Sequence, residues 1–213
     1  MAGQDDGSPA VPSLFHAFAE LTYERVLYLD PTGLPLQNLD HLLYDTPGAP
    51  ISGTRPYWLP QRERTQGALS GHLLVIEPSK QELSRVKKSL LEAPVLSPIT
   101  TLNNLYSAHA LVLPQHPYNT MISEFRTSEN REKYILTEWD PERAAHESYY
   151  VNFIDESAPM PWFDWPQEVM EKIRPSKAED EMVWRALYQR WARVRMDVCG
   201  LDLEPLQTVG QDT

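Results

Sequence analysis

The chain has very little cysteine and no excess of positive charge. Cys199 is the single cysteine among 213 residues, so no internal disulfide can form and nothing indicates an oxidising compartment. Lys and Arg number 19 against 30 Asp and Glu, which gives a formal net charge of -11 at pH 7. Because nucleic acids and anionic membranes bind basic surfaces, neither is expected as the main partner.

Long apolar runs are also absent. No segment reaches the length needed to cross a bilayer, and the polar N-terminus lacks the apolar stretch of a signal peptide. The sequence as written therefore predicts a cytoplasmic protein with no transmembrane segment. If a preceding anchor had been lost, the Golgi or another secretory membrane would be the expected location.

Several motifs that mark nucleotide or catalytic sites are missing. The chain has no Gly-x-Gly-x-x-Gly, no P-loop and no Gly-x-Ser-x-Gly. Cys199 lies at a predicted helix end without a basic neighbour that would clearly activate it, which favours a packed thiol over a nucleophile. The histidines do not show the paired spacing of a zinc site, which argues against a dedicated metal cluster. They are His16, His41, His72, His109, His116 and His146.

The sequence does contain enough apolar residues for a core, in an alternation of strand and helix patterns. Hydrophobic residues make up 41% of the chain. Short apolar runs predict strands at residues 25–30, 73–76, 110–114 and 149–155. Helices are expected at residues 12–21, 37–45, 79–92 and 100–109. Strands interleaved with helices indicate an α/β sheet, and the Pro- and Gly-rich residues 46–67 predict mostly loop.

Capping patterns mark two of the helices. Ser79 followed by Glu82 is a capping box, and so is Ser176 followed by Glu179, which begins a predicted C-terminal helix at residues 176–200. The apolar face of the earlier helix is predicted to comprise Leu83, Val86, Leu90 and Leu91. One domain is therefore expected at residues 13–200, between a disordered N-terminus at 1–12 and a flexible tail at 201–213.

Asp30 is the first candidate functional residue, because it ends an apolar strand and precedes Pro31-Thr32-Gly33. In open α/β sheets, ligands bind at the carboxyl ends of strands, so a carboxylate there can reach a bound group. Asp before Pro-x-Gly is also ordinary turn chemistry, and the local sequence alone favours the turn.

A Pro-interrupted segment at residues 113–126 is the second candidate. It carries Tyr118, Asn119, Glu124 and Arg126, which could line a polar pocket. It could equally be a structural loop held by its aromatic residues, and the sequence does not decide between the two.

Stretches in register along residues 13–165 resemble the glycosyltransferases of family 8, the glycogenin-like group, and most closely their fungal N-acetylglucosaminyltransferase-like branch. The stretches are YERVLYLDPTGLPLQNLDHLL, GHLLVIEPS, LNNLY, LVLPQHPYN with EFR, EWDP and VNFIDESAPMPW. The resemblance implies an α/β, Rossmann-like nucleotide-diphospho-sugar transferase fold with helices on both faces of a sheet. It also implies transfer of a sugar from a UDP-sugar to a hydroxyl of a glycan or protein acceptor.

The same resemblance implies a metal and a set of donor contacts. Members of the family hold manganese with an Asp-x-Asp motif and a later His, and the ion stabilises the departing diphosphate as a Lewis acid. Asp30 matches the first Asp, and Asn152 stands at the position of the His. The residues expected near the donor are Asp30, Thr32, Ser70, Gly71 and Asn103.

Departures from the family pattern concern the same positions. Thr32 replaces the second Asp, Asn152 the His, and Met160 the Lys of a Lys-Pro-Trp expected near the phosphates. Acidic residues that often surround the sugar are replaced by Pro98, Ile99 and Thr100. Fewer than thirty residues precede Asp30, so the uridine-binding half is expected to be missing, which would leave a parallel sheet with one uncovered edge.

Three hypotheses follow. The first is a degenerate, N-terminally truncated family 8 homologue, a pseudoenzyme with weak or lost transfer activity. The second is a non-catalytic binding or scaffold protein that uses the old cleft or the exposed edge to hold another protein. The third is a metal-independent transferase in which basic residues, namely Arg126, Arg131 or Lys133, replace the charge of manganese.

Overall fold

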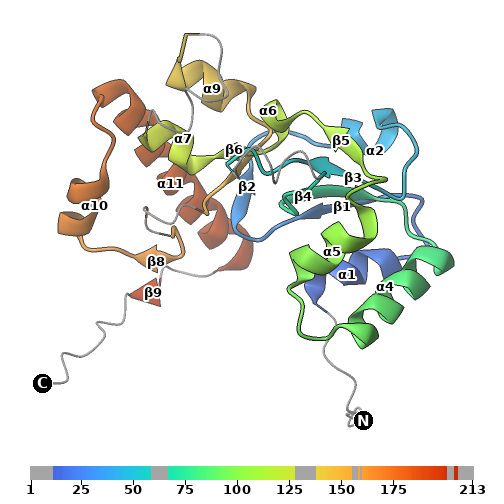
Figure 1. The fold of residues 1–213 in the computed structure, drawn as a ribbon. Coiled ribbons are helices and arrows are strands. Elements are labelled where there is room, and N and C mark those ends of the chain that lie inside the picture. Colours follow the sequence, from blue (N-terminus) through green and yellow to red (C-terminus); the bar gives the residue numbers. More distant parts are fainter. Residues whose placement is uncertain are drawn as a thin grey trace, which may run out of the picture. The chain divides into compact units, whose positions relative to one another are not determined.

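The computed structural model describes residues 12–58, 67–127, 138–154, 158, 160–200 and 204–205 (Figure 1). The chain forms two compact units. Unit 1 comprises Met1–Asp30 and Asn38–Gln115, and unit 2 comprises Pro31–Gln37 and His116–Thr213. Within the described ranges, no helix is both long and apolar enough to span a membrane.

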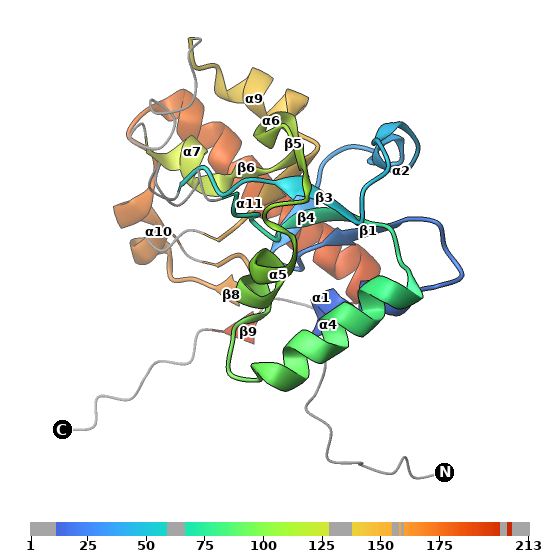
Figure 2. The same ribbon diagram turned by 45° about the vertical axis from the view of Figure 1, so that its right-hand side comes forward.

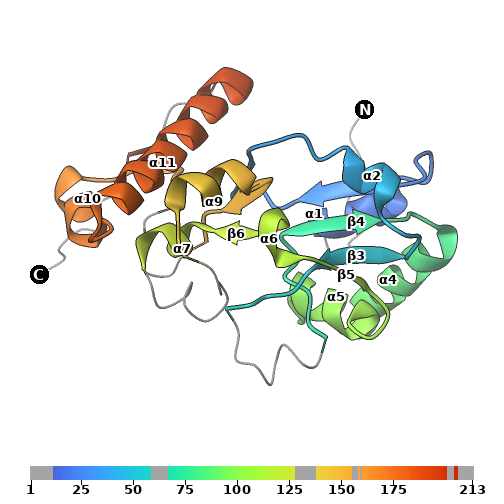
Figure 3. The same ribbon diagram turned by 90° about the horizontal axis from the view of Figure 1, so that it is seen from above.

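Unit 1 is built on a four-stranded mixed sheet. Its order is β1 (Val26–Leu29), β4 (Leu73–Ile76), β3 (Ile51–Thr54) and β5 (Leu111–Leu113), as Figure 3 shows. Strand β4 runs antiparallel to β1 and β3, whereas β3 and β5 are parallel. The expectation of a parallel sheet is therefore wrong for β4. Antiparallel neighbours such as β3 and β4 need no helical crossover between them, whereas parallel neighbours such as β3 and β5 do.

Helices cover one face of this sheet (Figures 1 and 2). They are α1 (Ser13–His16) with a 3-10 turn at Ala17–Ala19, α4 (Lys80–Glu92) and α5 (Pro98–Tyr106), while α2 (His41–Asp45) lies between β1 and β3 in sequence. Phe18, Leu74 and Tyr106 are fully buried between these layers, and the Phe18 and Tyr106 rings stack with centroids 5.6 Å apart.

Most predicted elements of unit 1 are present, with two corrections. The Ser79 cap is confirmed, since its side chain accepts a hydrogen bond from the Glu82 N–H at 3.1 Å. Leu91, by contrast, is 71% exposed and does not belong to the core face of α4. The predicted loop at 46–67 contains strand β3, whose four residues are all buried.

Unit 2 combines short strands with helices. One sheet has the order β2 (Gly33–Pro35), β7 (Tyr150–Asn152) and β6 (Thr120–Met121), and β8 (Phe163–Asp164) pairs with β9 (Glu204–Pro205). The helices are α6 (Gln115–Tyr118, starting at the unit boundary), α7 (Ile122–Arg126), α9 (Pro141–Glu147), α10 (Gln167–Ile173) and α11 (Ala178–Cys199).

Helix α11 confirms the predicted long C-terminal helix. Its apolar stripe buries Val183, Trp184, Leu187 and Trp191 in the core of unit 2. It ends at Gly200, whose φ of 64° is the left-handed conformation that glycine adopts at helix ends. The capping box predicted at Ser176 is wrong, because Lys177 precedes the helix and makes no side-chain cap.

Candidate functional site

The carboxyl end of β1 brings together several predicted donor contacts within unit 1. Because β4 is antiparallel to β1 and β3, its start lies at the same sheet edge as the ends of these two strands. Asp30 follows β1 there, and its backbone N–H donates to the His72 carbonyl at 2.8 Å. This edge is where ligands bind in open α/β sheets.

Ser70 and Gly71 shape the loop that enters β4 at this edge. The Ser70 N–H donates to the Thr54 carbonyl at 2.8 Å, and the two hydroxyl groups lie 2.9 Å apart. Gly71 has a φ of +78°, and an added Cβ would lie 2.7 Å from Cδ1 of Ile99. Only glycine fits this backbone without strain, so the loop passes closely over α5.

Asn103, on α5, clamps the same loop. Its Oδ1 accepts from the Leu69 N–H at 2.7 Å, and its Nδ2 donates to the Leu69 carbonyl at 3.2 Å. Both ends of the amide are thus bound to one backbone position. Asn103 positions the loop before β4, and its predicted contact with a donor stays a prediction.

Two residues at this edge were missed from the sequence. His72 is buried and stacks on Trp58, with ring centroids 5.1 Å apart and an interplanar angle of 11°. Arg55 directly follows β3 at the same edge. The signal for His72 lay in its position next to the predicted strand at 73–76, but the histidines were judged only by zinc-like spacing. Arg55 had no such signal, because residues 46–67 were predicted to be mostly loop.

The charge of the Asp30 carboxylate affects the pKa of Tyr28, which lies two residues earlier on β1. Burial first, and the Asp30 carboxylate second, raise the pKa of Tyr28 above its ordinary value, while a hydrogen bond with Ser13 lowers it. Unit 1 therefore keeps an acidic group at the strand end where the family resemblance places one.

In unit 2, the predicted ligand positions Thr32 and Asn152 bind each other. Nδ2 of Asn152 donates to Oγ1 of Thr32 at 3.0 Å, and its Oδ1 accepts from the Ile154 N–H at 2.8 Å. The Phe153 N–H donates to the Thr32 carbonyl at 3.0 Å, which continues the antiparallel pairing of Gly33 with Asn152. Asn152 is fully buried.

This arrangement does not fit a manganese ion. The Asn152 oxygen that would face a cation already accepts a backbone N–H, and Thr32 brings no negative charge. Manganese prefers carboxylate and imidazole ligands. Across the described ranges, no group of three or more His, Cys, Asp or Glu side chains is placed to hold a metal.

The segment at residues 113–126 is held by its own polar contacts. Oε1 of the buried Glu124 accepts from the Met121 N–H at 2.9 Å, and Oε2 lies 3.0 Å from Nε2 of His116. The Thr120 and Ser148 hydroxyl groups are 2.7 Å apart. These contacts favour the structural loop over the polar pocket.

Of the three basic residues named in the metal-independent hypothesis, only Arg126 lies within the described ranges. Arg126 ends α7 in unit 2, whereas Arg131 and Lys133 lie outside the described residues. Met160, at the position of the expected Lys, is 41% exposed and supplies no charge.

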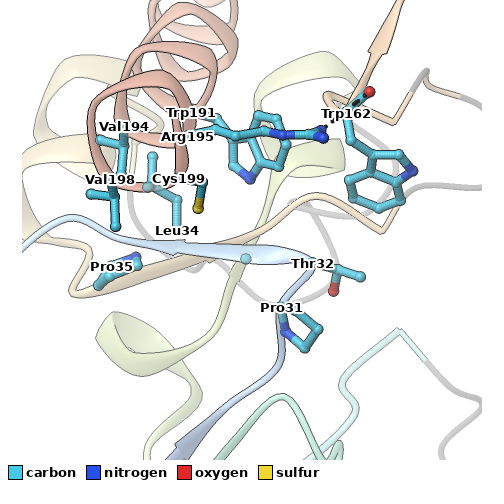
Figure 4. Close-up of a pocket in the computed structure, with 11 residues that line it drawn as sticks. Pro31, Thr32, Leu34, Pro35, Trp162, Trp191, Val194, Arg195, Val198 and Cys199 are labelled. Carbon is cyan, nitrogen blue, oxygen red and sulfur yellow. Dashed lines mark hydrogen bonds between the residues drawn. The ribbon is translucent and has the colours of Figure 1, made fainter. Parts of the chain in front are cut away.

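A pocket of about 570 Å³ lies entirely within unit 2, beside Thr32 (Figure 4). Its walls come from the segment Pro31–Pro35, Trp162 and the last turns of α11. Cys199 is exposed at its rim, so the expectation of a packed thiol is wrong.

Comparison with known proteins gives sequence relatives among fungi. No protein-family model matches the chain. A curated Aspergillus fumigatus protein named Glucose N-acetyltransferase 1 is 32% identical over 211 residues, which cover 86% of this chain and 53% of the relative. A Gibberella zeae protein of the same name is 28% identical over 207 residues, covering 92% of this chain and 45% of the relative. The chain thus spans about half the length of the curated relatives it matches.

Solved structures show the fold. The apo-form glycosyltransferase GlyE of Streptococcus pneumoniae matches with a TM-score of 0.53 and 15% identity, over 92% of this chain and 47% of that chain. A second GlyE structure gives a TM-score of 0.51 at 14% identity, over 83% of this chain and 45% of that chain. The chain therefore has the predicted glycosyltransferase fold and is a relative of fungal proteins named Glucose N-acetyltransferase 1, which confirms the glycosyltransferase resemblance of its motifs.

Proposed function

We propose that this chain is a homologue of sugar transferases that use a UDP-sugar donor, and that its own transfer activity is weak or lost. The fold and the fungal relatives support the first part. The second part rests on one observation, the bond between Asn152 and Thr32.

That bond uses the groups that the family pattern would turn toward a metal. With Thr in place of Asp, one formal negative charge is lost, and with Asn in place of His, one imidazole donor is lost. Losing a single ligand or its support costs about 10–100-fold in metal affinity. Two ligands are lost, and the Thr32 hydroxyl and the Asn152 amide are hydrogen-bonded inside the chain. The affinity for manganese is therefore expected to be low.

Residual donor binding would rest on unit 1. Asp30, Arg55 and His72 share the ligand-binding edge of its sheet. A guanidinium can contact phosphate oxygens by charge-assisted hydrogen bonds without a metal. Any remaining affinity for a UDP-sugar is therefore expected not to depend on manganese.

The test is a calorimetric titration of UDP and UDP-N-acetylglucosamine into the chain, with and without manganese. Asp30→Ala probes the strand end, and Asp164→Ala, a change of the same kind at an exposed position on β8, serves as the matched control. The proposal predicts weak or undetectable heat that manganese does not increase, together with no measurable sugar transfer.

Micromolar binding that requires manganese and disappears in Asp30→Ala would overturn the proposal. Micromolar metal-independent binding that is lost in Arg55→Gln, together with measurable sugar transfer, would also overturn the proposal. It would favour a metal-independent transferase in which Arg55, in place of the predicted Arg126, Arg131 or Lys133, supplies the charge. An absence of binding to a folded sample would agree with lost activity and would leave the scaffold hypothesis open. One edge strand of the unit 1 sheet, β1, is half-buried.

A further inference from the structure

The pocket in unit 2 has mostly apolar walls. Its volume of about 570 Å³ falls in the range of about 300–1,000 Å³ typical of small-molecule sites. Besides the two indoles, only Thr32, Arg195 and Cys199 among its lining residues carry a polar or ionisable side-chain group. An apolar body is therefore the part of a ligand that these walls would bind.

The apolar stripe of α11 continues into this pocket after its core contacts end. Leu187 and Trp191 are buried, but Val194 is 37% exposed and Val198 is 78% exposed, one and two turns further along. Both line the pocket opposite the Pro31–Pro35 segment (Figure 4). Contact of an apolar ligand with each exposed valine would lower the free energy of the complex, because it removes apolar surface from water.

Two tryptophans form the other side. The Trp162 and Trp191 ring centroids are 6.1 Å apart, with an interplanar angle of 50°. Such a pair offers two tilted apolar surfaces to a ligand. A free sugar needs several hydrogen-bond partners, and the side chains that line this pocket offer few.

Arg195 supplies a fixed positive charge. Its guanidinium lies over the Trp191 ring, 5.4 Å from the centroid, and Nη1 donates to the Trp162 carbonyl at 3.3 Å (Figure 4). In the described part of the chain it forms no ion pair with a carboxylate. A guanidinium held in place with most of its five N–H donors uncommitted is well suited to an anion.

We propose that this pocket binds a small amphipathic anion, a carboxylate, sulfonate or phosphate carried on an aryl or alkyl body. The body lies against Trp162, Val194 and Val198, and the anionic group accepts hydrogen bonds from Arg195. All of its lining residues belong to unit 2, and Thr32 is the one among them that the family pattern places near the donor.

Cys199 gives a local readout, because it is the only thiol in the chain and it lines the pocket. The full chain is alkylated with iodoacetamide in the presence of anilinonaphthalene sulfonate or of uncharged phenylnaphthylamine, which has nearly the same ring body. Mass spectrometry follows the rate, and fluorescence titration gives the affinities. Occupation of the pocket by the sulfonate is expected to slow alkylation severalfold.

Two arginine variants separate charge from shape. Arg195→Gln is expected to weaken sulfonate binding about tenfold, the loss of one charge-assisted hydrogen bond, and to leave binding of the uncharged probe unchanged. Arg193→Gln, two residues away on α11 and outside the pocket, makes the same charge change and should alter neither. Arg195→Lys should keep part of the sulfonate affinity.

Three results would overturn the proposal. The first is sulfonate binding without protection of Cys199, which would place the probe elsewhere. The second is equal binding of both probes by the parent chain, or equal loss of both in Arg195→Gln, which would deny a role to the charge. The third is protection of Cys199 that rises with protein concentration in the absence of probe, which would show that a second copy of the chain covers the pocket.

Discussion

The two units treat the polar residues at their strand ends in opposite ways. In unit 1, the Asp30 backbone N–H donates to the His72 carbonyl, and the charge of the Asp30 carboxylate raises the pKa of Tyr28. In unit 2, the side chains of Thr32 and Asn152 bind each other, and both are neutral. Unit 1 thus has a charged side chain, Asp30, at its strand end, whereas in unit 2 the corresponding polar side chains, Thr32 and Asn152, make a structural hydrogen bond.

The difference shows how a ligand position can be lost without loss of the fold. A neutral hydroxyl and a neutral amide can satisfy each other's hydrogen bonding in a part-buried site at modest cost, whereas a pair of buried carboxylates needs a compensating cation. Mutations at the two strand ends should therefore change the free energy of unfolding by very different amounts.

The largest contrast is expected from the Thr32–Asn152 bond. Asn152→Ala leaves the Thr32 hydroxyl and the Ile154 N–H without this buried partner, and should lower the free energy of unfolding by about 2–4 kcal/mol. In a double-mutant cycle with Thr32→Val, measured by urea denaturation, the coupling should be about 1 kcal/mol. Asp30→Asn should change stability by only about 0.5 kcal/mol. Purely additive effects of the Thr32 and Asn152 changes would break the comparison.

Glycines in the two sheets provide a second contrast. A Cβ on Gly33 would collide with the ring of the fully buried Tyr150, so Gly33→Ala should destabilise unit 2 by about 1–3 kcal/mol. In unit 1, a Cβ on Gly53 would lie 2.6 Å from Cδ2 of the buried Leu74 and 3.2 Å from the Leu73 carbonyl oxygen, a milder overlap than at Gly33. Thermal unfolding should therefore show a smaller loss for Gly53→Ala, and the reverse order would contradict the packing described.

The serines before α4 and α11 should differ in their contribution to the free energy of unfolding, because only Ser79 makes a capping hydrogen bond. Ser79 accepts a hydrogen bond from the Glu82 N–H, so Ser79→Ala should cost about 1 kcal/mol in chemical denaturation. Ser176 caps no helix, and Ser176→Ala should cost nothing measurable beyond about 0.5 kcal/mol. Equal losses would show that α11 is capped by Ser176 after all.

The smallest effect is a pH dependence in unit 2. Burial lowers the pKa of His116, but the hydrogen bond and charge of Glu124 raise it by more, so the pKa lies above its ordinary value of about 6.5. The His116–Glu124 contribution to stability should be fully present below that ordinary value. It should be lost as pH rises through the raised pKa. Melting temperatures across this interval should decline less in His116→Gln, and an unchanged pH profile would exclude the ion pair.

Local sequence predicted the regular elements well where pattern and length agree. Leu73–Ile76 and the Ser79 cap were found because an apolar run and a capping box leave few alternatives. Strand β3 was missed because Pro50 and Gly53 interrupt a short run, and its burial on all four residues depends on neighbours far along the chain. The direction of β4 has no local signature at all.

The candidate site was predictable only as a set of positions. Resemblance to a family pointed to Asp30, Thr32 and Asn152, but residue types alone could not say that the last two bind each other. They are 120 positions apart, and their contact depends on the pairing of β2 with β7. The two hydrogen bonds between the Asn103 side chain and the Leu69 backbone likewise could not be predicted, because they join a helix to a loop far away in the sequence.

The most direct test of the central claim is a titration of manganese into the unmodified chain, followed by the electron paramagnetic resonance signal of the free ion. Because Thr32 and Asn152 are engaged with each other and carry no charge, the signal should grow as it does in buffer alone, and Asn152→Ala should not change it. Micromolar binding that Asn152→Ala or Thr32→Val abolishes would contradict the account, since it would show that these two side chains still hold a metal.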